Sequence, residues 1–308
     1  MAGGTASVNT VVPVDLDGDR LDLIVARLGG VSRALARSLV ERGSVAVDGE
    51  TVAAVNRRVA AGSGIAFDLP DATDPLVPEE VPFDVLYEDR YLAVVSKPAG
   101  VVTHPGAGRT GATLVAGILH RWPSVRGVGD EGRWGIVHRL DRDTSGALVV
   151  ALSVEAFGPL RTMIRQRRVE RRYLALVKGT PSMPTGTIDA PIAADRRRRG
   201  RRRIDPSGRS ARTHYRSVAS GGGVTLLEVT LETGRTHQIR VHLTAAGLPI
   251  LGDRQYGIGS GAPRQFLHAA RVRFEHPITQ EPLDVPAPLP PDLREVLAEH
   301  GLEYRSEI

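Results

Sequence analysis

The sequence contains no cysteine among its 308 residues. This excludes disulfides, thiol catalysis and any zinc or iron–sulfur site with cysteine ligands. It also has no run of about 18–20 apolar residues, so we expect no transmembrane span and no membrane partner. Residues 1–10 lack the basic start and apolar stretch of a secretory signal, which makes the cytoplasm the expected location.

Lysine is nearly absent as well, because Lys97 and Lys178 are the only two. The net charge of +5 is therefore carried by arginine, and it is unevenly distributed. Residues 196–216 contain ten arginines and one acid, a net of +9, which leaves −4 for the rest of the chain. A bias toward arginine codons would explain arginine over lysine, but not the clustering. The cluster predicts contact with a polyanion such as nucleic acid.

The length allows two domains, and the pattern of residues 15–70 favours a small one. Apolar residues recur at helical spacing over residues 21–28, and a second helical pattern covers residues 32–43. Residues 45–50 predict a strand that enters an Asp-Gly turn. We interpret residues 1–14 as a disordered lead, since they show neither pattern.

A proline-rich and acidic stretch, residues 71–82, predicts a linker to a second domain at residues 83–305. Strands are expected within residues 85–96 and at 147–152, 173–177, 224–231 and 272–274. Helices are expected at residues 114–121, 156–166, 238–246 and 291–300. Because these elements are intermixed without a regular βαβ alternation, they indicate an α+β domain around a mixed, mostly antiparallel sheet.

Residues 135–146 contain the most informative string of the second domain, in which Asp141 stands between two arginines. Nearby cations lower the pKa of a carboxyl group, so we expect Asp141 to be ionised at neutral pH. An ionised carboxylate suits a nucleophile or a general base better than a proton donor. His138, three residues earlier, is interpreted as a structural, hydrogen-bonded histidine.

Asp143 raises the alternative of a glycosidase with two carboxylates. Residues two apart point in opposite directions on a strand and diverge on a helix. A glycosidase needs one protonated and one ionised acid about 5–10 Å apart across the substrate. We therefore interpret Asp143 as a turn or capping residue.

Four segments of the second domain, together with the first domain, resemble known families. The segments are residues 97–108, 135–146, 170–177 and 232–257. They resemble the RluA/RluD family of large-subunit ribosomal RNA pseudouridine synthases, which implies the pseudouridine synthase fold. The helix–helix–strand unit of residues 15–69 resembles the S4 RNA-binding domain.

The resemblance implies a role for each matching residue. Asp141 would be the catalytic acid, and Arg139 would fill the gap left by a flipped nucleotide. Tyr173 would stack on the target base. Arg240 would form an ion pair with Asp141, with Arg235 as the runner-up. Asp141 would either attack carbon or remove a ribose proton, and the sequence does not choose between these two roles.

The implied isomerisation oxidises nothing and takes no group from outside, so we expect neither a cofactor nor a metal. His237 and His242 could suggest a metal site. They lie five residues apart instead of one helical turn, and no carboxylate completes a set of ligands.

Further arginines are candidates for RNA contact. Arg33 and Arg37 lie four residues apart on the second helix and could straddle phosphates. The alternative is a solvated face with Arg37 paired to Glu41, and residues 1–75 carry a net charge of −3.

The arginine run of residues 196–203 holds arginine at seven of its eight positions. Arg198 and Arg202 are the residues that we expect to contact RNA there. Because neighbouring like charges repel, we predict that the run is disordered until RNA binds.

The resemblance implies 23S ribosomal RNA or a pre-50S particle as the partner, with helix 69 uridines as targets. We expect the protein to be a monomer. Two other functions remain open. A non-catalytic S4-type RNA-binding or ribosome-assembly protein would not need Asp141, Tyr173 and Arg240 together. A glycosidase or nucleosidase would release free uracil.

Overall fold

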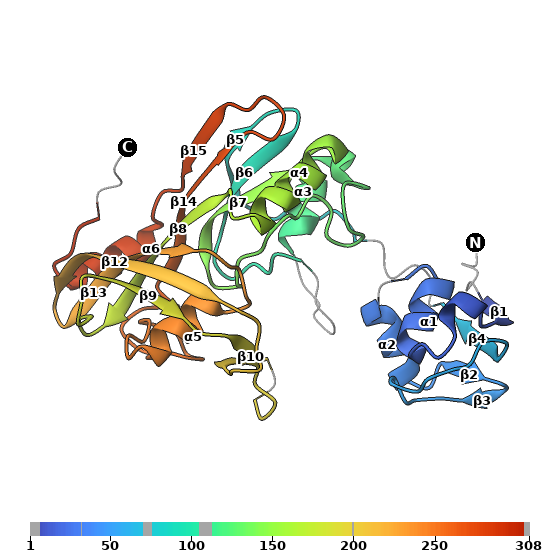
Figure 1. The fold of residues 1–308 in the computed structure, drawn as a ribbon. Helices are drawn as coiled ribbons and strands as arrows, with labels where there is room; N and C mark the ends of the chain where they lie inside the picture. The colour runs from blue at the N-terminus through green and yellow to red at the C-terminus, as the bar shows by residue number, and fades with distance from the viewer. Residues whose placement is uncertain (1–6, 32, 70–75, 105–112, 199, 305–308) are drawn as a thin grey trace. The chain divides into compact units, whose positions relative to one another are not determined.

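The computed structural model describes residues 7–31, 33–69, 76–104, 113–198 and 200–304. Contacts divide the chain into two units, Met1–Pro75 and Leu76–Ile308 (Figure 1). Each unit has an apolar core of its own. Within the described ranges, no helix is long and apolar enough to cross a membrane.

The smaller unit packs two helices against a four-stranded antiparallel sheet, in the order β1-β4-β2-β3. Its elements are β1 (Ser7–Val11), η1 (Val14–Leu16), α1 (Leu21–Leu28), α2 (Arg33–Glu41), β2 (Val45–Val47), β3 (Glu50–Thr51) and β4 (Gly64–Asp68). The apolar positions that predicted α1 face the core, where Leu21, Ile24 and Val25 are fully buried.

The prediction of a disordered lead at residues 1–14 is wrong from Ser7 onward. β1 pairs with β4 along its whole length, and Ser7 Oγ donates to Asp68 Oδ1 at 2.6 Å. The strand lies at the edge of the sheet and is mostly exposed, so it lacks the apolar alternation by which strands are recognised. Residues 1–6 of the predicted lead lie outside the described residues.

The larger unit is built on a nine-stranded sheet in the order β5-β6-β7-β14-β8-β13-β12-β9, with β15 paired to β14. The strands are β5 (Asp84–Glu88), β6 (Leu92–Lys97), β7 (Ser145–Ala151), β8 (Glu170–Lys178), β9 (Thr185–Asp189), β12 (Arg212–Gly221), β13 (Val224–Leu231), β14 (Leu267–Glu275) and β15 (Pro282–Pro286). Only the β7–β14 pair is parallel in this sheet. The predicted α+β class with a mixed, mostly antiparallel sheet is confirmed.

Four α-helices accompany this sheet, and each coincides closely with a predicted range. They are α3 (Leu114–Arg121), α4 (Val154–Arg165), α5 (Gln238–Ala245) and α6 (Pro291–Glu299), with a short η2 (Pro123–Val125). The hydroxyls of Thr113 and Ser153 cap α3 and α4 by accepting the backbone N–H groups of Ala116 and Ala156. Strands β9, β12 and β15 were not predicted, because their residues are largely polar or partly exposed.

Gly146 makes the parallel contact between β7 and β14 possible. Its φ is 112°, and a Cβ there would lie 2.2 Å from the carbonyl oxygen of Ala269. Only glycine fits this close approach of two backbones. The contact fixes the start of β7, and therefore the loop that carries Asp141 just before it.

Part of the predicted linker at residues 71–82 belongs to the larger unit. Val81 is buried, and the backbone N–H of Glu79 donates to Ala116 O in α3 at 3.3 Å. A Cβ on Gly117 would lie 2.7 Å from Cβ of Val81, so the helix and this segment are in direct contact. The composition predicted a linker because this stretch is rich in proline and acidic residues and contains few apolar residues that could be recognised as buried. Residues 71–75 lie outside the described residues.

Candidate active site

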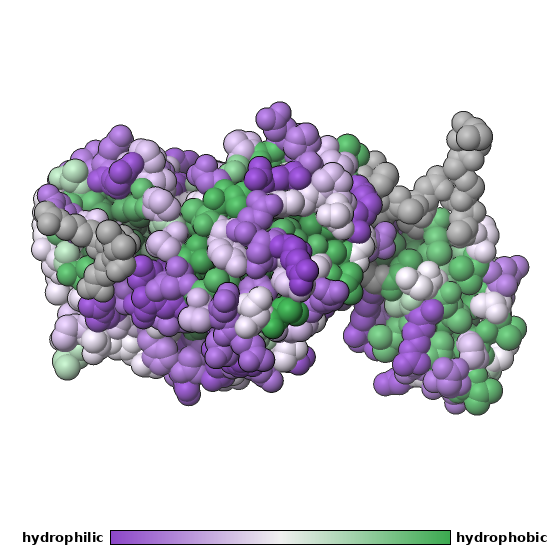
Figure 2. Space-filling view, turned by 90° about the horizontal axis from the view of Figure 1, so that it is seen from above, coloured by the Kyte–Doolittle hydropathy of each residue, from purple (hydrophilic) through white to green (hydrophobic). Residues whose placement is uncertain are grey.

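A cavity of about 480 Å³ opens in the larger unit, where the loop before β7 meets β8, α4 and the segment that leads into α5. This volume lies within the usual range of small-ligand sites, roughly 300–1,000 Å³. Eight arginines line it: Arg139, Arg161, Arg165, Arg167, Arg171, Arg209, Arg235 and Arg240. Among the described residues of the lining, the acids are Asp141 and Glu232. The face of the larger unit seen in Figure 2 is mostly hydrophilic, with small apolar patches.

Lys97, at the end of β6, stabilises the loop that carries Asp141 through hydrogen bonds. Lys97 Nζ donates to the carbonyl oxygens of Pro98, Val101 and Arg142 at 2.6, 2.9 and 3.0 Å. The side chain is fully buried, and this burial lowers the pKa of Lys97 to about 7. Three carbonyls replace its water shell, so the lysine joins two loops rigidly.

Two further side chains fix the residues just before Asp141. Thr103 Oγ1 donates to the carbonyl oxygen of Leu140 at 2.9 Å. His138 Nε2 accepts the backbone N–H of Val149 at 3.0 Å. Burial lowers the pKa of His138 to about 3, so its ring is neutral and can accept this bond. His138 therefore supports the loop, as the sequence indicated.

Arg240, on α5, joins Asp141 to a second, buried carboxylate. Its Nη1 donates to Asp141 Oδ2 at 3.0 Å. Its Nε and Nη2 donate to the two oxygens of Asp253 at 2.7 and 2.9 Å. The side chains of Arg240 and Asp253 are 7% and 1% exposed, whereas that of Asp141 is 15% exposed and faces the cavity. The predicted contact between Arg240 and Asp141 is present, and Asp253 was not foreseen.

The electrostatics of this cluster keep its inner pair charged. Burial by itself raises the pKa of Asp253, but hydrogen bonds and charge from Arg240 outweigh it and lower that pKa below its ordinary value. Burial likewise opposes the charge of Arg240, and the two carboxylates raise the pKa of the arginine overall. The guanidinium is thus a fixed cation beside Asp141.

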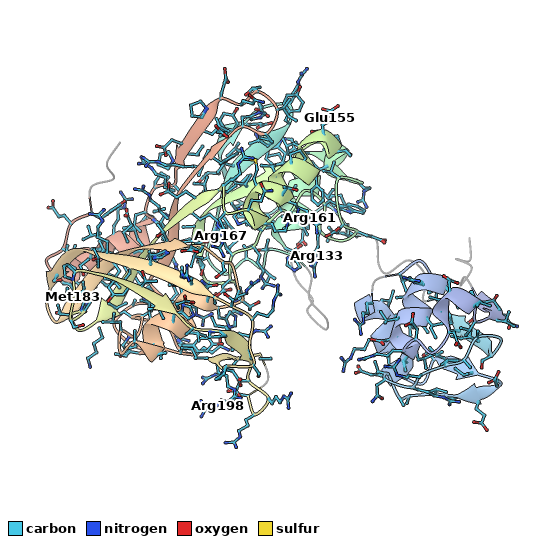
Figure 3. The ribbon with its side chains drawn as sticks, in the orientation of Figure 1. Arg133, Glu155, Arg161, Arg167, Met183 and Arg198 are labelled. Carbon is cyan, nitrogen blue, oxygen red and sulfur yellow. The ribbon has the colours of Figure 1, made fainter. Side chains whose placement is uncertain are left out.

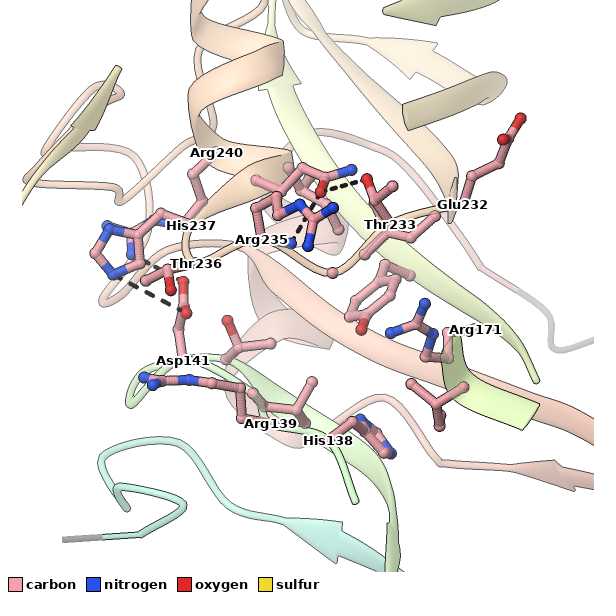
Figure 4. A pocket seen from close by; sticks show the side chains of 18 of the residues that line it. His138, Arg139, Asp141, Arg171, Glu232, Thr233, Arg235, Thr236, His237 and Arg240 are labelled. Carbon is pink, nitrogen blue, oxygen red and sulfur yellow. Dashed lines mark hydrogen bonds and ion pairs between the residues drawn. The ribbon is translucent and has the colours of Figure 1, made fainter. Parts of the chain in front are cut away.

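His237 lies close to the other carboxylate oxygen of Asp141 (Figure 4). It has a left-handed backbone, with φ 59°, at the N-cap of α5. Its Nε2 lies 4.0 Å from Asp141 Oδ1, and its Nδ1 lies 2.8 Å from the hydroxyl of Tyr256. Burial lowers the pKa of His237 although Asp141 opposes the shift, so the ring is neutral.

Tyr173 lies in β8 and lines the same cavity. It is 5% exposed, with its backbone paired between Val229 of β13 and Ala269 of β14. Burial raises the pKa of its hydroxyl, so the ring stays neutral. The central position in the sheet gives the ring a fixed place on the cavity wall.

The sequence and the fold were compared with known proteins. The family model described as RNA pseudouridylate synthase matches residues 91–245, and the S4 domain model matches residues 19–65. The chain is 46% identical over 292 residues to a Chloroflexus aurantiacus protein named uncharacterized RNA pseudouridine synthase, covering 93% of this chain and 92% of that one. It is 39% identical over 311 residues to the ribosomal large subunit pseudouridine synthase D of Xylella fastidiosa, covering 95% and 92%.

The chain belongs to the RNA pseudouridine synthase family. Among solved structures, human RNA pseudouridylate synthase domain containing 1 is 31% identical, with a TM-score of 0.57, and the match covers 70% of this chain and 87% of the human one. The protein is therefore an isomerase, and its smaller unit is an S4 domain.

Besides Asp141, the one described acid of the cavity lining is Glu232, and its oxygens are engaged by cations. Asp143 forms an ion pair with Arg142 at 3.0 Å and is absent from the cavity lining. Glu232 lies at the wall, where Arg167, Arg212 and His214 contact its oxygens. The geometry thus gives no support to a glycosidase with two acids.

His242, the other histidine of the metal alternative, is buried away from Asp141. Its Nδ1 and Nε2 lie 2.9 Å from Thr213 Oγ1 and 3.0 Å from the carbonyl oxygen of Ala190. In the part of the chain that the structure describes, no group of three or more histidine, aspartate or glutamate residues could hold a metal ion.

Two of the predicted RNA-contacting arginines of the synthase lie at the cavity. Arg139 is exposed beside Asp141, and the described residues place no carboxylate within 4.0 Å of it. Arg235 also lines the cavity, but its Nε donates to Ser210 O at 3.0 Å and does not contact Asp141. Arg161 and Arg167 extend the basic wall beside α4 (Figure 3).

The arginine run is not disordered where the structure describes it, which corrects that prediction. β10 (Ile192–Ala194) pairs with β11 (Arg202–Ile204) in an antiparallel hairpin. Asp195 Oδ1 accepts the backbone N–H groups of Arg197 and Arg198, which stabilises the turn despite the like charges. Arg198 itself is exposed near the tip (Figure 3).

In the S4 domain, both candidate arginines are engaged by acids. Arg33 Nε donates to Asp22 Oδ2 at 2.9 Å, and Asp22 is buried. Arg37 Nε donates to Glu41 Oε1 at 2.9 Å, the pairing that the alternative interpretation expected. Each side chain is still more than half exposed, so other guanidinium N–H groups remain open to RNA.

Sequence reasoning assigned no role to three residues that complete the site. Asp253 and Gln255 contact Arg240, and Tyr256 contacts His237. They follow α5 in the string Gly252-Asp253 to Tyr256-Gly257. The string was noticed only as part of a family segment, because no spacing rule links it to Asp141.

Proposed function

We propose that this synthase isomerises specific uridines of 23S ribosomal RNA, in the helix 69 region, with Asp141 as its single catalytic carboxylate. It acts as a monomer on free RNA or on a pre-50S particle. The large-subunit substrate is supported by the S4 domain and by the relative from Xylella fastidiosa, which is named ribosomal large subunit pseudouridine synthase D. The observation that carries the proposal is Asp141, held by Arg240 in a cavity lined by eight arginines.

The arrangement suits a base that has left its helix. Arginines around the cavity neutralise phosphates, and Arg139 occupies the vacancy in the stack. Tyr173 supports the extruded uracil with its buried ring. The target carbon and ribose then lie next to the carboxylate of Asp141.

The chemistry conserves every atom of the RNA. Asp141 either attacks carbon or removes a ribose proton, and the bond from N1 of uracil to the ribose breaks. Uracil rotates and C5 bonds to the ribose carbon; the bond to Asp141 breaks in the first route, and the ribose proton returns in the second. The C5 proton departs while N1 gains one. Arg240 supports either role, because it fixes the direction of the carboxylate and stabilises its charge.

Two other functions make different predictions. A non-catalytic RNA-binding or ribosome-assembly protein has no use for a carboxylate held at the cavity by a buried arginine. A nucleosidase would release free uracil and leave an abasic site, whereas the isomerase leaves the mass of the RNA unchanged.

Mapping of pseudouridine in 23S ribosomal RNA tests the proposal in cells. Cells that lack this protein should lose pseudouridine at helix 69 positions, and the wild-type gene should restore it. A gene carrying Asp141→Asn should not restore it. Unchanged helix 69 modification in the deleted strain would overturn the proposed target.

A further inference from the structure

The arginine hairpin formed by β10 and β11 carries cations that are free for RNA. Among the described residues, no carboxylate lies within 4.0 Å of the guanidinium groups of Arg198, Arg201 or Arg202. The hairpin base is anchored by Ile192, which packs in a small apolar cluster with Val241 of α5 and with Tyr256. The hairpin is therefore connected to the helix that carries Arg240.

Two contacts join the hairpin to the segment after Asp253. The backbone N–H of Arg202 donates to the hydroxyl oxygen of Tyr256 at 2.6 Å, and Gln255 Nε2 donates to Gly200 O at 3.3 Å. The guanidinium of Arg201 lies 5.7 Å from the centre of the Tyr256 ring. A shift of the hairpin would therefore change the hydrogen bonds of Tyr256 and Gln255 first.

The same two side chains contact the partners of Asp141. Gln255 Oε1 accepts from Arg240 Nη2 at 3.1 Å, and the Arg240 guanidinium lies 4.9 Å from the Tyr256 ring centre. The Tyr256 hydroxyl lies 2.8 Å from His237 Nδ1. Arg240 and His237, the partners of Asp141, are thus each contacted by a residue that also contacts the hairpin.

The hydrogen bonds around the Tyr256 hydroxyl are all satisfied when the neutral His237 ring carries its proton on Nε2. Tyr256 accepts from the N–H of Arg202, so its own proton is available to His237 Nδ1. With Nδ1 as the acceptor of that proton, the ring proton is on Nε2, the atom that lies 4.0 Å from Asp141 Oδ1. In this tautomer the hydroxyl of Tyr256 keeps a donor facing Asp141.

We propose that Tyr256 is a positioning residue that couples the arginine hairpin to Asp141 through His237. RNA phosphates bound by the hairpin hold the Arg202 backbone against Tyr256. This keeps the Nε2–H of His237 directed at Asp141, so the orientation that Arg240 gives the carboxylate is maintained when RNA is seated. The inference rests on the proposed function in taking Asp141 as the catalytic group.

Tyr256→Phe tests the coupling, because it removes the hydroxyl and keeps the ring. Single-turnover pseudouridine formation at saturating 23S transcript should slow by about tenfold, with little change in RNA affinity. The matched control is Tyr87→Phe on β5, which also removes a tyrosine hydroxyl, one that donates to Asp89 Oδ2 at 2.8 Å. A purely structural effect would give both variants the same rate.

A double-mutant cycle tests the connection to the hairpin. Arg201→Gln should weaken RNA binding in either background, but it should slow the bound reaction only when Tyr256 is present. Rate effects of Arg201→Gln and Tyr256→Phe that multiply would overturn the proposal.

The ¹⁵N resonances of the His237 ring provide a readout that does not depend on activity. Addition of the RNA should shift them in the wild type and in Tyr87→Phe, but not in Tyr256→Phe. If the wild type binds RNA and makes no pseudouridine, the proposed function fails while this response still decides the coupling. An RNA response that Tyr256→Phe leaves intact would overturn it.

Discussion

Arg240 and Asp253 form a two-pronged ion pair, with N–O distances of 2.7 and 2.9 Å, that leaves Nη1 of the arginine free to hold Asp141. Asp253 also accepts the backbone N–H groups of Gln255 and Tyr256. The arginine therefore has a fixed orientation before substrate arrives. Asp253 orients Arg240 without lying at the cavity wall.

Asp253→Asn should lower both stability and the rate of isomerisation. The change leaves a buried guanidinium without its main counter-charge, which costs about 3–5 kcal/mol in the free energy of unfolding. Urea denaturation measures this loss, and single-turnover assays measure the rate. The control is Glu275→Gln, which breaks a pair with Arg168 in which both side chains are more than half exposed, and it should cost about 1 kcal/mol or less. Equal losses in the two variants would contradict this role of Asp253.

Stability should fall as the pH decreases below 6.5, because a buried histidine must remain neutral. Ser145 Oγ lies 2.9 Å from Nδ1 of His268, whose Nε2 lies 3.1 Å from Ala287 O. Burial lowers the pKa of His268 from 6.5 to about 4. The unfolded chain takes up a proton in this window and the folded chain does not, so stability is complete above pH 6.5 and is lost toward pH 4.

Between pH 7 and pH 5 the loss from this one group is about 2 kcal/mol. Urea denaturation at the two pH values measures it. His268→Gln should be less stable at pH 7 but should lose correspondingly less on acidification. The exposed His120 provides the control, since His120→Gln should keep the wild-type dependence. A His268→Gln protein with an unchanged pH dependence would rule out this histidine as the source.

The salt dependence of RNA binding should show whether the hairpin arginines contact RNA phosphates. Arg198→Gln with Arg202→Gln removes two cations that we expect to contact phosphates. The slope of log K against log salt should become shallower by about 1.4–1.8, at roughly 0.7–0.9 per contact. Filter binding from 50 to 300 mM salt measures the slope. Arg294→Gln, on the exposed face of α6, should leave it unchanged. An unaltered slope in the double variant would show that the hairpin does not contact phosphates.

The sequence predicted the elements whose burial is strong and periodic. The ranges of α3 and β13 match those predicted, because their apolar residues face one core. It missed β1 and the hairpin of β10 and β11, whose stability comes from backbone pairing with few buried side chains. Charge repulsion among the arginines does not unfold the hairpin, because Asp195 and Tyr256 accept hydrogen bonds from its backbone.

The residues of the site also fall into those that the sequence predicted and those that it did not. Asp141 was predicted because it stands in a distinctive string, and Arg240 because it stands in another. Asp253, His237 and Tyr256 act through contacts between loops, and no local pattern encodes those contacts. Only the fold brings the three together.

The central claim is that the Asp141 carboxylate carries the isomerisation, and purified Asp141→Asn protein tests it most directly. Its matched control is Asp143→Asn, two residues along the same loop but paired to Arg142. Both variants should bind 23S transcript like the wild type. Pseudouridine formation over many hours should be undetectable with Asp141→Asn and should persist with Asp143→Asn. Pseudouridine formed by Asp141→Asn at a rate near that of the wild type would contradict the account.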